Sequence, residues 1–371
     1  MVALWVATAY AVLMVIRLGL AWRRADILHD RSETDLAITI YQPILSGDPM
    51  LETCLAANLR AAPAAHFVWL IDDDDPDAQA IAARLADPRV TVLLGRGPRD
   101  GENPKLLKLD RPAIPDGIVL VLDDDTVLRP GGAAALAAAA EQHEGLACAL
   151  PVWSARPRTL AEACLASFIN GQGASLYLSM AALGRTRTIN GMAYAVRGAD
   201  LRRLGGFAAA GHALTDDWAV AQLWRRAGLP CVQTTIPAEV ATSLSGFSSA
   251  LSILRRWMQF AWMCLRGEAD LVIASLIALP PLLALVGVTL AVSQGPVFVG
   301  AWVVLLVARA YGEALLRRKT SNLPVTPGGL ALAAVIEPVL PLLSAAAFVR
   351  PSQVRWRSRK MEIVEGEIHY R

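Results

Sequence analysis

Short apolar runs alternate with helical patterns along the first part of the chain. Four segments are typical of strands: residues 35–41, which alternate between apolar and polar, and the apolar runs 66–71, 90–94 and 119–122, of which the last has the pattern of a buried strand. Helical patterns follow the first two of them, at residues 50–60 and 76–86. Strands that alternate with helices predict an α/β fold with a parallel sheet, and ligands of such sheets bind outside the carboxyl ends of the strands.

The same kind of pattern continues to about residue 250. It predicts a strand at 146–152, a helical stretch at 159–183 and a further strand element at 188–197. A helix then begins at Asp216 or Asp217 and ends before Gly228. Residues 252–266 contain two Trp, two Met, a Phe and three Arg, a composition typical of an amphipathic helix in a membrane interface.

Four long apolar runs predict membrane segments: residues 1–20, 271–293, 296–311 and 327–349. They raise the hydrophobic share of the chain to 54%, above that of an ordinary soluble protein. The predicted organisation has five parts: an anchor (1–21), a catalytic domain (22–248), an interfacial helix (249–270), membrane helices (271–349) and a basic cytoplasmic tail (350–371).

The last apolar run differs from the others. It has Glu337, Pro338 and Pro341 near its middle and basic residues on both sides, so a straight crossing would violate the positive-inside rule. We therefore expect two C-terminal spanning helices and, at 327–349, a re-entrant or interfacial helical hairpin.

Charge and cysteine content restrict location and partners. Arg23 and Arg24 follow the first apolar run, which predicts a retained anchor with the domain after it facing the cytoplasm. The five cysteines have no metal-ligand spacing and are expected to be reduced thiols. A formal net charge of +2 gives no indication of a nucleic-acid partner.

The candidate chemistry lies at the ends of two predicted strands. Asp123 and Asp125 follow the run at 119–122, and carboxylates placed there are suited to a shared Mg²⁺ or Mn²⁺ ion. Asp124 between them is equally well explained as a turn residue that caps the following helix. Asp72 ends the run at 66–71, whereas Asp74 and Asp75 can be explained as capping residues before Pro76. No phosphate-binding glycine motif is present.

Six short motifs together resemble the ceramide glucosyltransferase family, with a bacterial-type member as the expected match. They are D-x-D-D-P at Asp72–Pro76, G-x-N-P-K at Gly101–Lys105, Asp123 after its strand, G-M-x-x-x-x-R at Gly191–Arg197, the pair Asp216–Asp217, and R-W at Arg256–Trp257. The chain departs from the family at Ile253, where the family has Gln or Arg.

This resemblance implies an α/β fold of the GT-A type and an inverting, metal-dependent transfer of sugar from a UDP-sugar to the hydroxyl of a membrane lipid, ceramide first. It implies that Asp217 is the general base. Asp123 and Asp125 would hold the metal. The residues expected to bind the nucleotide sugar are Asp72, Lys105, Asp123, Arg256 and Trp257. No nucleic acid is expected as a partner.

Three other functions stay open. A hopanoid or diacylglycerol glycosyltransferase would differ only in its lipid. A processive polysaccharide synthase shares the metal site and the R-W pair, but it needs more spanning helices than this chain offers. A membrane-tethered sensor of sugar nucleotides would bind the donor without transferring the sugar.

Overall fold

The structure is a computed structural model of the 371-residue chain. It describes residues 1–27, 34–153, 157–211, 213, 215–267, 270–347, 353–356, 359–364 and 367–370. For residues 27, 260, 263–267, 347 and the described part of 353–370, only the backbone is described.

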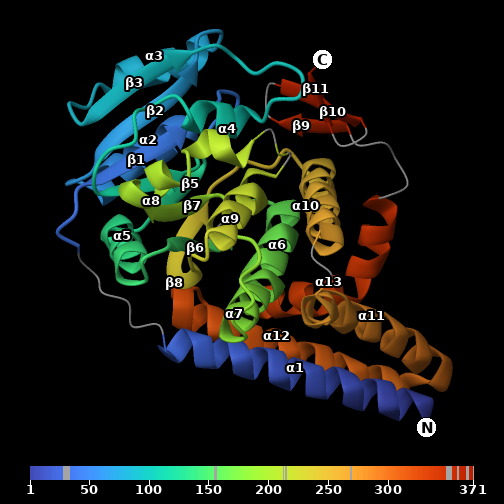
Figure 1. Cartoon of the computed structure of the whole chain (residues 1–371). Helices are drawn as coiled ribbons and strands as arrows, with labels where there is room; N and C mark the ends of the chain where they lie inside the picture. The colour runs from blue at the N-terminus through green and yellow to red at the C-terminus, as the bar shows by residue number, and fades with distance from the viewer. Residues whose placement is uncertain are drawn as a thin grey trace. The chain divides into compact units, whose positions relative to one another are not determined.

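The chain divides into two compact units, each built from segments that are far apart in sequence. We call Met1–Leu28, Pro151–Arg185 and Leu244–Arg350 the helical unit, and His29–Leu150, Thr186–Ser243 and Pro351–Arg371 the sheet unit. The order of helices and strands can be followed by colour in Figure 1.

An eight-stranded mixed sheet has the strand order β3-β2-β1-β4-β7-β6-β8-β5. The strands are β1 (Ile38–Pro43), β2 (His66–Asp72), β3 (Val90–Gly95), β4 (Ile118–Leu122), β5 (Thr126–Leu128), β6 (Leu146–Trp153), β7 (Ala193–Arg197) and β8 (Cys231–Val240). Strands β3, β2, β1 and β4 are parallel, and β7 runs antiparallel to β4. The strand order reverses direction at β1, so the crevice expected for a ligand lies between the carboxyl ends of β1 and β4.

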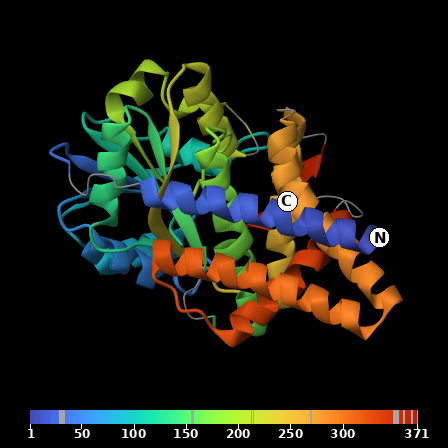
Figure 2. The same cartoon turned by 90° about the horizontal axis from the view of Figure 1, so that it is seen from below.

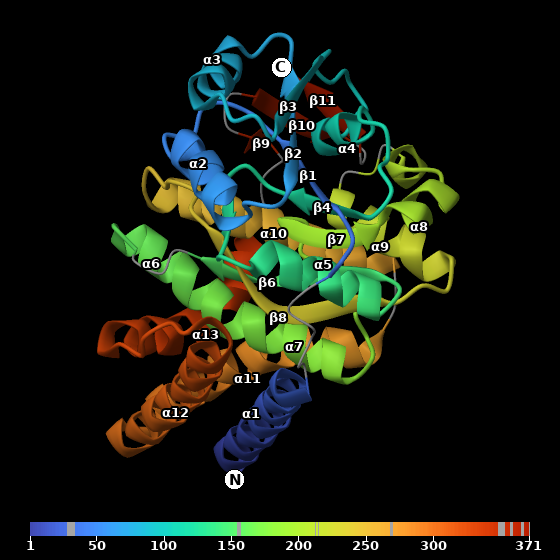
Figure 3. The same cartoon turned by 90° about the vertical axis from the view of Figure 1, so that its left-hand side faces the viewer.

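Helices cover both faces of this sheet, as Figure 3 shows. One face packs against α2 (Leu51–Ala61), α3 (Pro76–Leu85) and α5 (Gly132–Gln142). The other packs against α4 (Pro104–Leu109), α8 (Gly198–Arg203) and α9 (Asp216–Arg226), with the short helix η2 (Phe207–Ala210). All five residues of β4 are buried because alternate side chains enter the two cores: Leu120 faces the first, Val119 and Val121 the second.

The helical unit contains α1 (Val2–Ile27), α6 (Leu160–Ser167), the π-helix η1 (Phe168–Gly173), α7 (Ala174–Ala182), α10 (Phe247–Gly267), α11 (Leu271–Gln294), α12 (Pro296–Ser321) and α13 (Pro327–Ala347). Four of these, α1, α11, α12 and α13, are long and apolar enough to cross a membrane. Figure 2 shows α1 in blue running beside α12 in orange.

Most elements predicted from periodicity are confirmed within a few residues, and so is the α/β class. The sequence did not predict α4, β5, α8, η2, β8 or the small C-terminal sheet of β9 (Gln353–Trp356), β10 (Arg359–Val364) and β11 (Glu367–Tyr370). Three of these strands have four residues or fewer, too short for a reliable periodic signal.

The helical hairpin expected at residues 327–349 is wrong. Helix α13 is continuous from Pro327 to Ala347, with Pro338 and Pro341 inside it. Each proline removes one backbone hydrogen bond, but in an apolar setting the neighbouring helices can support such a helix without a turn. The path of α13 through a membrane remains a prediction.

Candidate active site

Helix α4 begins directly after the glycine-rich loop of the G-x-N-P-K motif. The Asn103 side chain caps it by accepting hydrogen bonds from the backbone N–H groups of Lys105 (2.9 Å) and Leu106 (3.1 Å), and Pro104 occupies the first turn. Lys105 and Lys108 are three residues apart and therefore lie on neighbouring positions of one helix face. This short helix brings two lysines to the carboxyl edge of the sheet.

Lys105 joins three parts of the sheet unit. Its Nζ donates to the carbonyl oxygen of Gly191 (2.6 Å) and forms ion pairs with Asp123 Oδ1 (2.7 Å) and Asp216 Oδ2 (3.1 Å). The Lys105 side chain is 9% exposed, whereas that of Asp123 is 32% exposed. One nearly buried cation is therefore shared by two carboxylates, and one of these carboxylates remains open to a ligand.

Asp216 and Asp217 occupy the first turn of α9, where the positive end of the helix dipole favours carboxylates. Asp217 Oδ1 accepts a hydrogen bond from the N–H of Trp218 (2.7 Å). Gly191 makes room for this helix start, because a β-carbon there would lie 3.1 Å from Asp217 Cβ and 3.4 Å from Lys105 Nζ. The glycine of the G-M-x-x-x-x-R motif thus permits close packing of the acidic and basic groups.

This cluster contains more acidic side chains than basic ones. Burial raises the pKa of Asp123 to about 7, with Lys105 opposing the shift and Asp125 and Asp216 adding to it. Burial and the neighbouring Asp216 carboxylate also raise the pKa of Asp217 to about 7. Although burial lowers it, the carboxylates of Asp123 and Asp216 hold the pKa of Lys105 well above its usual value. The cluster therefore favours an added proton or cation.

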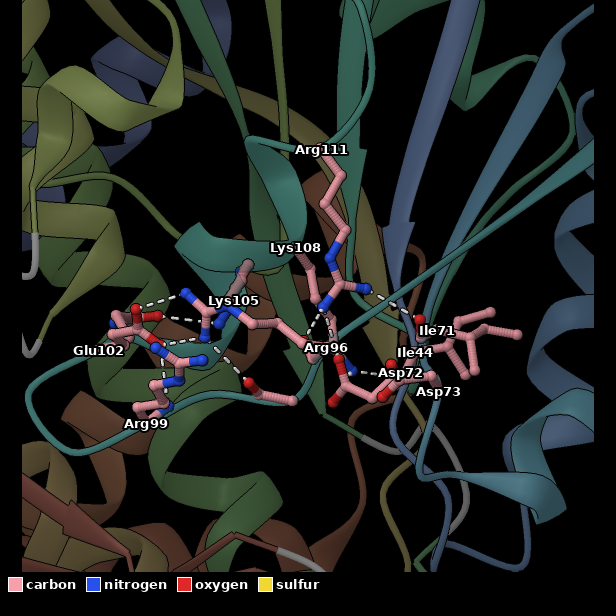
Figure 4. Close-up of polar contacts among 12 residues, drawn as sticks. Ile44, Ile71, Asp72, Asp73, Arg96, Arg99, Glu102, Lys105, Lys108 and Arg111 are labelled. Atoms are coloured by element: carbon pink, nitrogen blue, oxygen red, sulfur yellow. Dashed lines mark hydrogen bonds and ion pairs between the residues drawn. The ribbon is translucent and has the colours of Figure 1, made fainter.

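Asp72 lies at the tip of β2 in a separate, buried group of charges. Its Oδ1 is 2.7 Å from Arg111 Nη2 and its Oδ2 is 3.1 Å from Lys108 Nζ. Arg111 also donates to the carbonyl oxygen of Ile71 (2.8 Å), and Lys108 donates to that of Ile44. Figure 4 shows Lys108 and Arg111 converging on Asp72. Both carboxylate oxygens are thus held inside the protein, with the side chain 1% exposed.

The glycine-rich loop is held in shape by Glu102. Its carboxylate accepts two hydrogen bonds from the Arg96 guanidinium, both 2.6 Å long, and one from the backbone N–H of Arg99 (2.8 Å), as Figure 4 shows. The carbonyl of Arg96 in turn accepts a hydrogen bond from Arg111 (2.6 Å). The Arg111 guanidinium fits beside Gly95, where a β-carbon would lie 2.8 Å from its Nε. The loop and the Asp72 group therefore form one connected structure.

Asp124 and Asp125 have different surroundings. Asp124 is buried, and its Oδ2 accepts a hydrogen bond from the backbone N–H of Leu45 (2.8 Å), which ties the loop after β1 to the end of β4. Asp125 accepts hydrogen bonds from the hydroxyls of Thr242 (2.5 Å) and Thr126 (3.3 Å). Asp75 accepts a hydrogen bond from Ala78 as the cap of α3, which confirms the capping role predicted for it.

The sequence profile described as "Glycosyl transferase family 21" matches residues 2–369. The chain belongs to this family. The resemblance to ceramide glucosyltransferases is thereby confirmed at the level of the family. No protein of curated function matches the chain.

Three solved glycosyltransferase structures are similar to this family 21 chain. The mannosyltransferase PcManGT from Pyrobaculum calidifontis, in complex with GDP-Man and Mn²⁺, is 18% identical over 90% of this chain and 98% of its own, with a TM-score of 0.50. Glucosyl-3-phosphoglycerate synthase from Mycobacterium tuberculosis is 14% identical over 62% of this chain and 79% of its own, with a TM-score of 0.36. S. aureus TarS 1-349 in complex with UDP-GlcNAc is 10% identical over 91% of this chain and 97% of its own, with a TM-score of 0.35. The first of these supports the predicted GT-A fold. Family and fold together make this chain a sugar-nucleotide-dependent glycosyltransferase.

The structure brings some of the predicted site residues of this transferase into contact. Lys105 and Asp123 form an ion pair, and Asp217 adjoins the same cluster through Gly191. Asp72 belongs to the separate group with Lys108 and Arg111. Arg256 and Trp257 lie on α10 in the helical unit, where the Trp257 ring packs edge-on against Trp153 at 5.8 Å between centroids.

Lys108 and Arg111 were not predicted as site residues from the sequence. One signal for Lys108 was available: Asn-Pro after a loop marks a helix start, and from that start Lys105 and Lys108 fall on one face. Arg111 follows the end of α4 in a turn that has no periodic pattern, so nothing in the sequence indicates that it reaches Asp72.

Proposed function

We propose that this family 21 member transfers a sugar from a UDP-sugar to the primary hydroxyl of a membrane lipid, most specifically ceramide, with inversion at the anomeric carbon. The observation that carries this proposal is the cluster of Lys105, Asp123, Asp216 and Asp217 at the carboxyl edge of the sheet. Such an edge is where open α/β sheets bind their ligands. In this cluster the Asp217 carboxylate has a raised pKa and can accept a proton, and the positive charge of Lys105 can stabilise an anionic leaving group.

The proposed proton acceptor is Asp217. The acceptor hydroxyl must lose its proton as it attacks the sugar, and a general base works best with a pKa near the working pH. The pKa of Asp217, raised to about 7, meets that requirement. One direct displacement inverts the configuration, so an α-linked donor gives a β-glycoside. The proton moves to Asp217, and the nucleoside diphosphate leaves as an anion.

The donor set fits a divalent cation. Among the described residues, no three His, Cys, Asp or Glu side chains converge as a complete metal site. Mg²⁺ does not need such a set, since it commonly binds one or two carboxylates together with substrate phosphates and water. Asp123, one-third exposed, and Asp125 would hold Mg²⁺ or Mn²⁺. The ion would neutralise the charge that develops on the leaving diphosphate.

The remaining donor contacts are proposed from motif and charge. Lys105 would attract the diphosphate and keep Asp123 oriented, since it already pairs with that carboxylate. Arg256 is suited to bidentate contact with phosphate, and Trp257 beside it would complete the donor site. Asp72 would face the nucleoside from the tip of β2. For that contact Asp72 must exchange its ion pair with Lys108 or with Arg111, so these two residues belong to this part of the proposal.

A lipid acceptor is supported by the four helices that are apolar enough to cross a membrane. We propose that residues 1–21 anchor the chain in a bacterial inner membrane, that residues 22–248 are the catalytic domain on the cytoplasmic side, and that residues 249–270 lie in the interface. Residues 271–349 would be the membrane helices and 350–371 a cytoplasmic tail. Arg23 and Arg24 after the first apolar run support this orientation.

The experiment that tests the function combines purified protein with a panel of UDP-sugars and with ceramide, diacylglycerol or a hopanoid, and reads the products by mass spectrometry. We expect ceramide to gain one sugar unit. Transfer only to another lipid would replace the acceptor, and products with many sugar units would indicate a polysaccharide synthase. Donor binding without transfer or hydrolysis would indicate a sensor and contradict the proposal.

Removal of either proposed metal ligand is expected to weaken donor binding. In Asp123→Ala and Asp125→Ala the cation loses one of few protein ligands and the diphosphate loses its counter-charge. Titration of UDP-sugar with Mg²⁺ or Mn²⁺, with and without EDTA, measures the effect, and EDTA should add little in the variants. The control is Asp77→Ala, which removes an exposed carboxylate on α3. Metal-dependent binding at wild-type strength in both variants would exclude this site.

A further inference from the structure

The π-helix η1 holds the backbone of Trp153 through one side chain. Asn170 Oδ1 accepts a hydrogen bond from the N–H of Trp153 (2.7 Å), and Asn170 Nδ2 donates to the carbonyl oxygen of Trp153 (2.8 Å). Asn170 is 4% exposed and Trp153 is 3% exposed, so water does not compete for these bonds. Such π-turns are rare and occur frequently at functional sites. Here the π-turn carries the amide that fixes Trp153 in place.

Trp153 in turn packs against Trp257, the tryptophan of the R-W pair. The rings of Trp153 and Trp257 meet edge-on, with interplanar angle 81° and centroids 5.8 Å apart, a preferred geometry for aromatic pairs. The indole nitrogen of Trp153 is buried and has no hydrogen-bond partner in the described part of the chain. Trp153 therefore contacts Trp257 through ring packing and not through a hydrogen bond.

The other side of η1 is held by charged residues of the apolar helices. Arg17 of α1 donates to the carbonyl oxygen of Gln172 and to the hydroxyl of Ser175 (2.9 Å). That hydroxyl also lies within hydrogen-bond distance of Glu313 Oε1 on α12 (3.2 Å). A β-carbon at Gly171 would lie 2.7 Å from Glu313 Oε2, so η1 runs directly against this carboxylate.

These groups belong to one buried network with balanced charge. Glu313 forms an ion pair with Arg309 (2.6 Å), which also pairs with Glu337 of α13 (2.7 Å), and Tyr10 of α1 donates to Glu337. With Arg17, the network contains two cations and two anions. Ionisable side chains in apolar helices are costly and usually functional, and each here has a partner of opposite charge or a backbone acceptor.

We infer that this network positions Trp257 for sugar transfer through η1, Asn170 and Trp153. The inference rests on the proposed function in one respect, the role of the R-W pair in the donor site. Asn170, Glu313 and Arg17 are then positioning residues. Helix α1 helps to position Trp257 through Arg17, in addition to anchoring the chain. The contacts that connect Arg17 to Trp257 all lie within the helical unit.

The first test is a double-mutant cycle between Asn170 and Trp257. We expect Asn170→Ala to lower kcat/KM for the UDP-sugar about tenfold, because a small misplacement of a contact residue has effects of this size or larger. We expect little further loss when Asn170→Ala is added to Trp257→Ala, because the two residues act through one ring. If Asn170 acted independently of Trp257, the losses of the two single variants would multiply in the double variant. That result would contradict the inference.

Two substitutions of Trp153 keep the test informative if Asn170→Ala folds poorly. Trp153→Phe makes the ring smaller but preserves an aromatic edge, and the nitrogen it removes has no hydrogen-bond partner among the described residues, so activity should stay closer to wild type than in Trp153→Ala. Trp153→Ala removes the ring and should reproduce the effect of Asn170→Ala. Equal activity of the Phe and Ala variants would overturn the inference.

The network is tested by Glu313→Gln against a matched control. Lys319→Gln breaks an exposed ion pair with Asp26 that joins the same two helices, α1 and α12, away from η1. We expect Glu313→Gln to lower kcat/KM about tenfold, as for Asn170→Ala, and Lys319→Gln to have little effect. Equal effects of the two substitutions would overturn the inference.

A spectroscopic measurement separates this inference from the proposed function. The Trp153–Trp257 pair should give an exciton couplet in circular dichroism that disappears in Trp257→Phe. Glu313→Gln and Asn170→Ala should weaken the couplet even if no lipid acceptor is found. An unchanged couplet in both variants would show that η1 does not position Trp257, whatever reaction the protein catalyses.

Discussion

Replacement of Asp217 by Asn is expected to lower the turnover number by about 10² to 10⁴ while binding of the UDP-sugar stays nearly unchanged. Asn has nearly the same shape, and its side-chain oxygen can still accept the hydrogen bond that Trp218 N–H donates to Asp217. The amide cannot accept the proton of the attacking hydroxyl. Steady-state kinetics together with a separate titration of donor binding measure the two effects.

The neighbouring carboxylate is the control for this substitution. Asp216→Asn should be milder, because Lys105 keeps its contacts with Asp123 and Gly191 when one of its ion pairs is weakened. If Asp216→Asn abolishes transfer and Asp217→Asn does not, the base is Asp216. Full activity in both variants would exclude a general base at the start of α9.

The pH profile tests the same assignment. A general base acts in its ionised form, and the pKa of Asp217 is raised to about 7, chiefly by burial. Activity limited by the base should therefore be low near pH 5 and rise as the pH increases through 7. In Asp217→Asn this rising limb should disappear from the residual activity. A wild-type profile that is flat between pH 5 and 8 would contradict the role of Asp217.

Replacement of Asp72 by Asn is expected to destabilise the sheet unit by about 3–5 kcal/mol. The substitution removes the carboxylate that forms an ion pair with buried Lys108, and Arg111 loses the same partner. Uncompensated charges with side-chain exposures of 2% and 14% have little access to water. Thermal or denaturant unfolding of the detergent-solubilised protein measures the loss.

The control for Asp72→Asn is Glu52→Gln, which breaks the exposed ion pair with Arg84 and should change stability little. If Asp72→Asn is as mild as this control but removes donor binding, the carboxylate serves the nucleoside and its ion pairs are secondary. If both stability and donor binding are unchanged, neither role assigned to Asp72 holds.

Much of the sheet unit could be predicted because its signals are local. The run from Val119 to Leu122 is apolar at every position because β4 is covered on both faces, and Asp123 to Asp125 follow it because a strand that ends at a sheet edge meets polar surroundings. Asp216 and Asp217 were also predictable from nearby residues, because carboxylates are favoured at the start of a helix. Helix α4 was missed because its six residues are fewer than two turns, too few for a periodic pattern.

The sequence by itself determined the α/β alternation, the carboxylates at strand and helix ends and the four apolar segments, because each is set by residues that are consecutive or close together in the sequence. Only the tertiary structure decided which charges meet. Lys105 reaches Gly191, 86 residues away, and Tyr10 reaches Glu337, 327 residues away. Periodicity reports which face of an element is buried, but not which element covers it. The pairing of Asp72 with Lys108 and Arg111, the π-turn at Asn170 and the contact of Trp153 with Trp257 therefore had no local signal, since each depends on packing between segments that the chain itself leaves far apart.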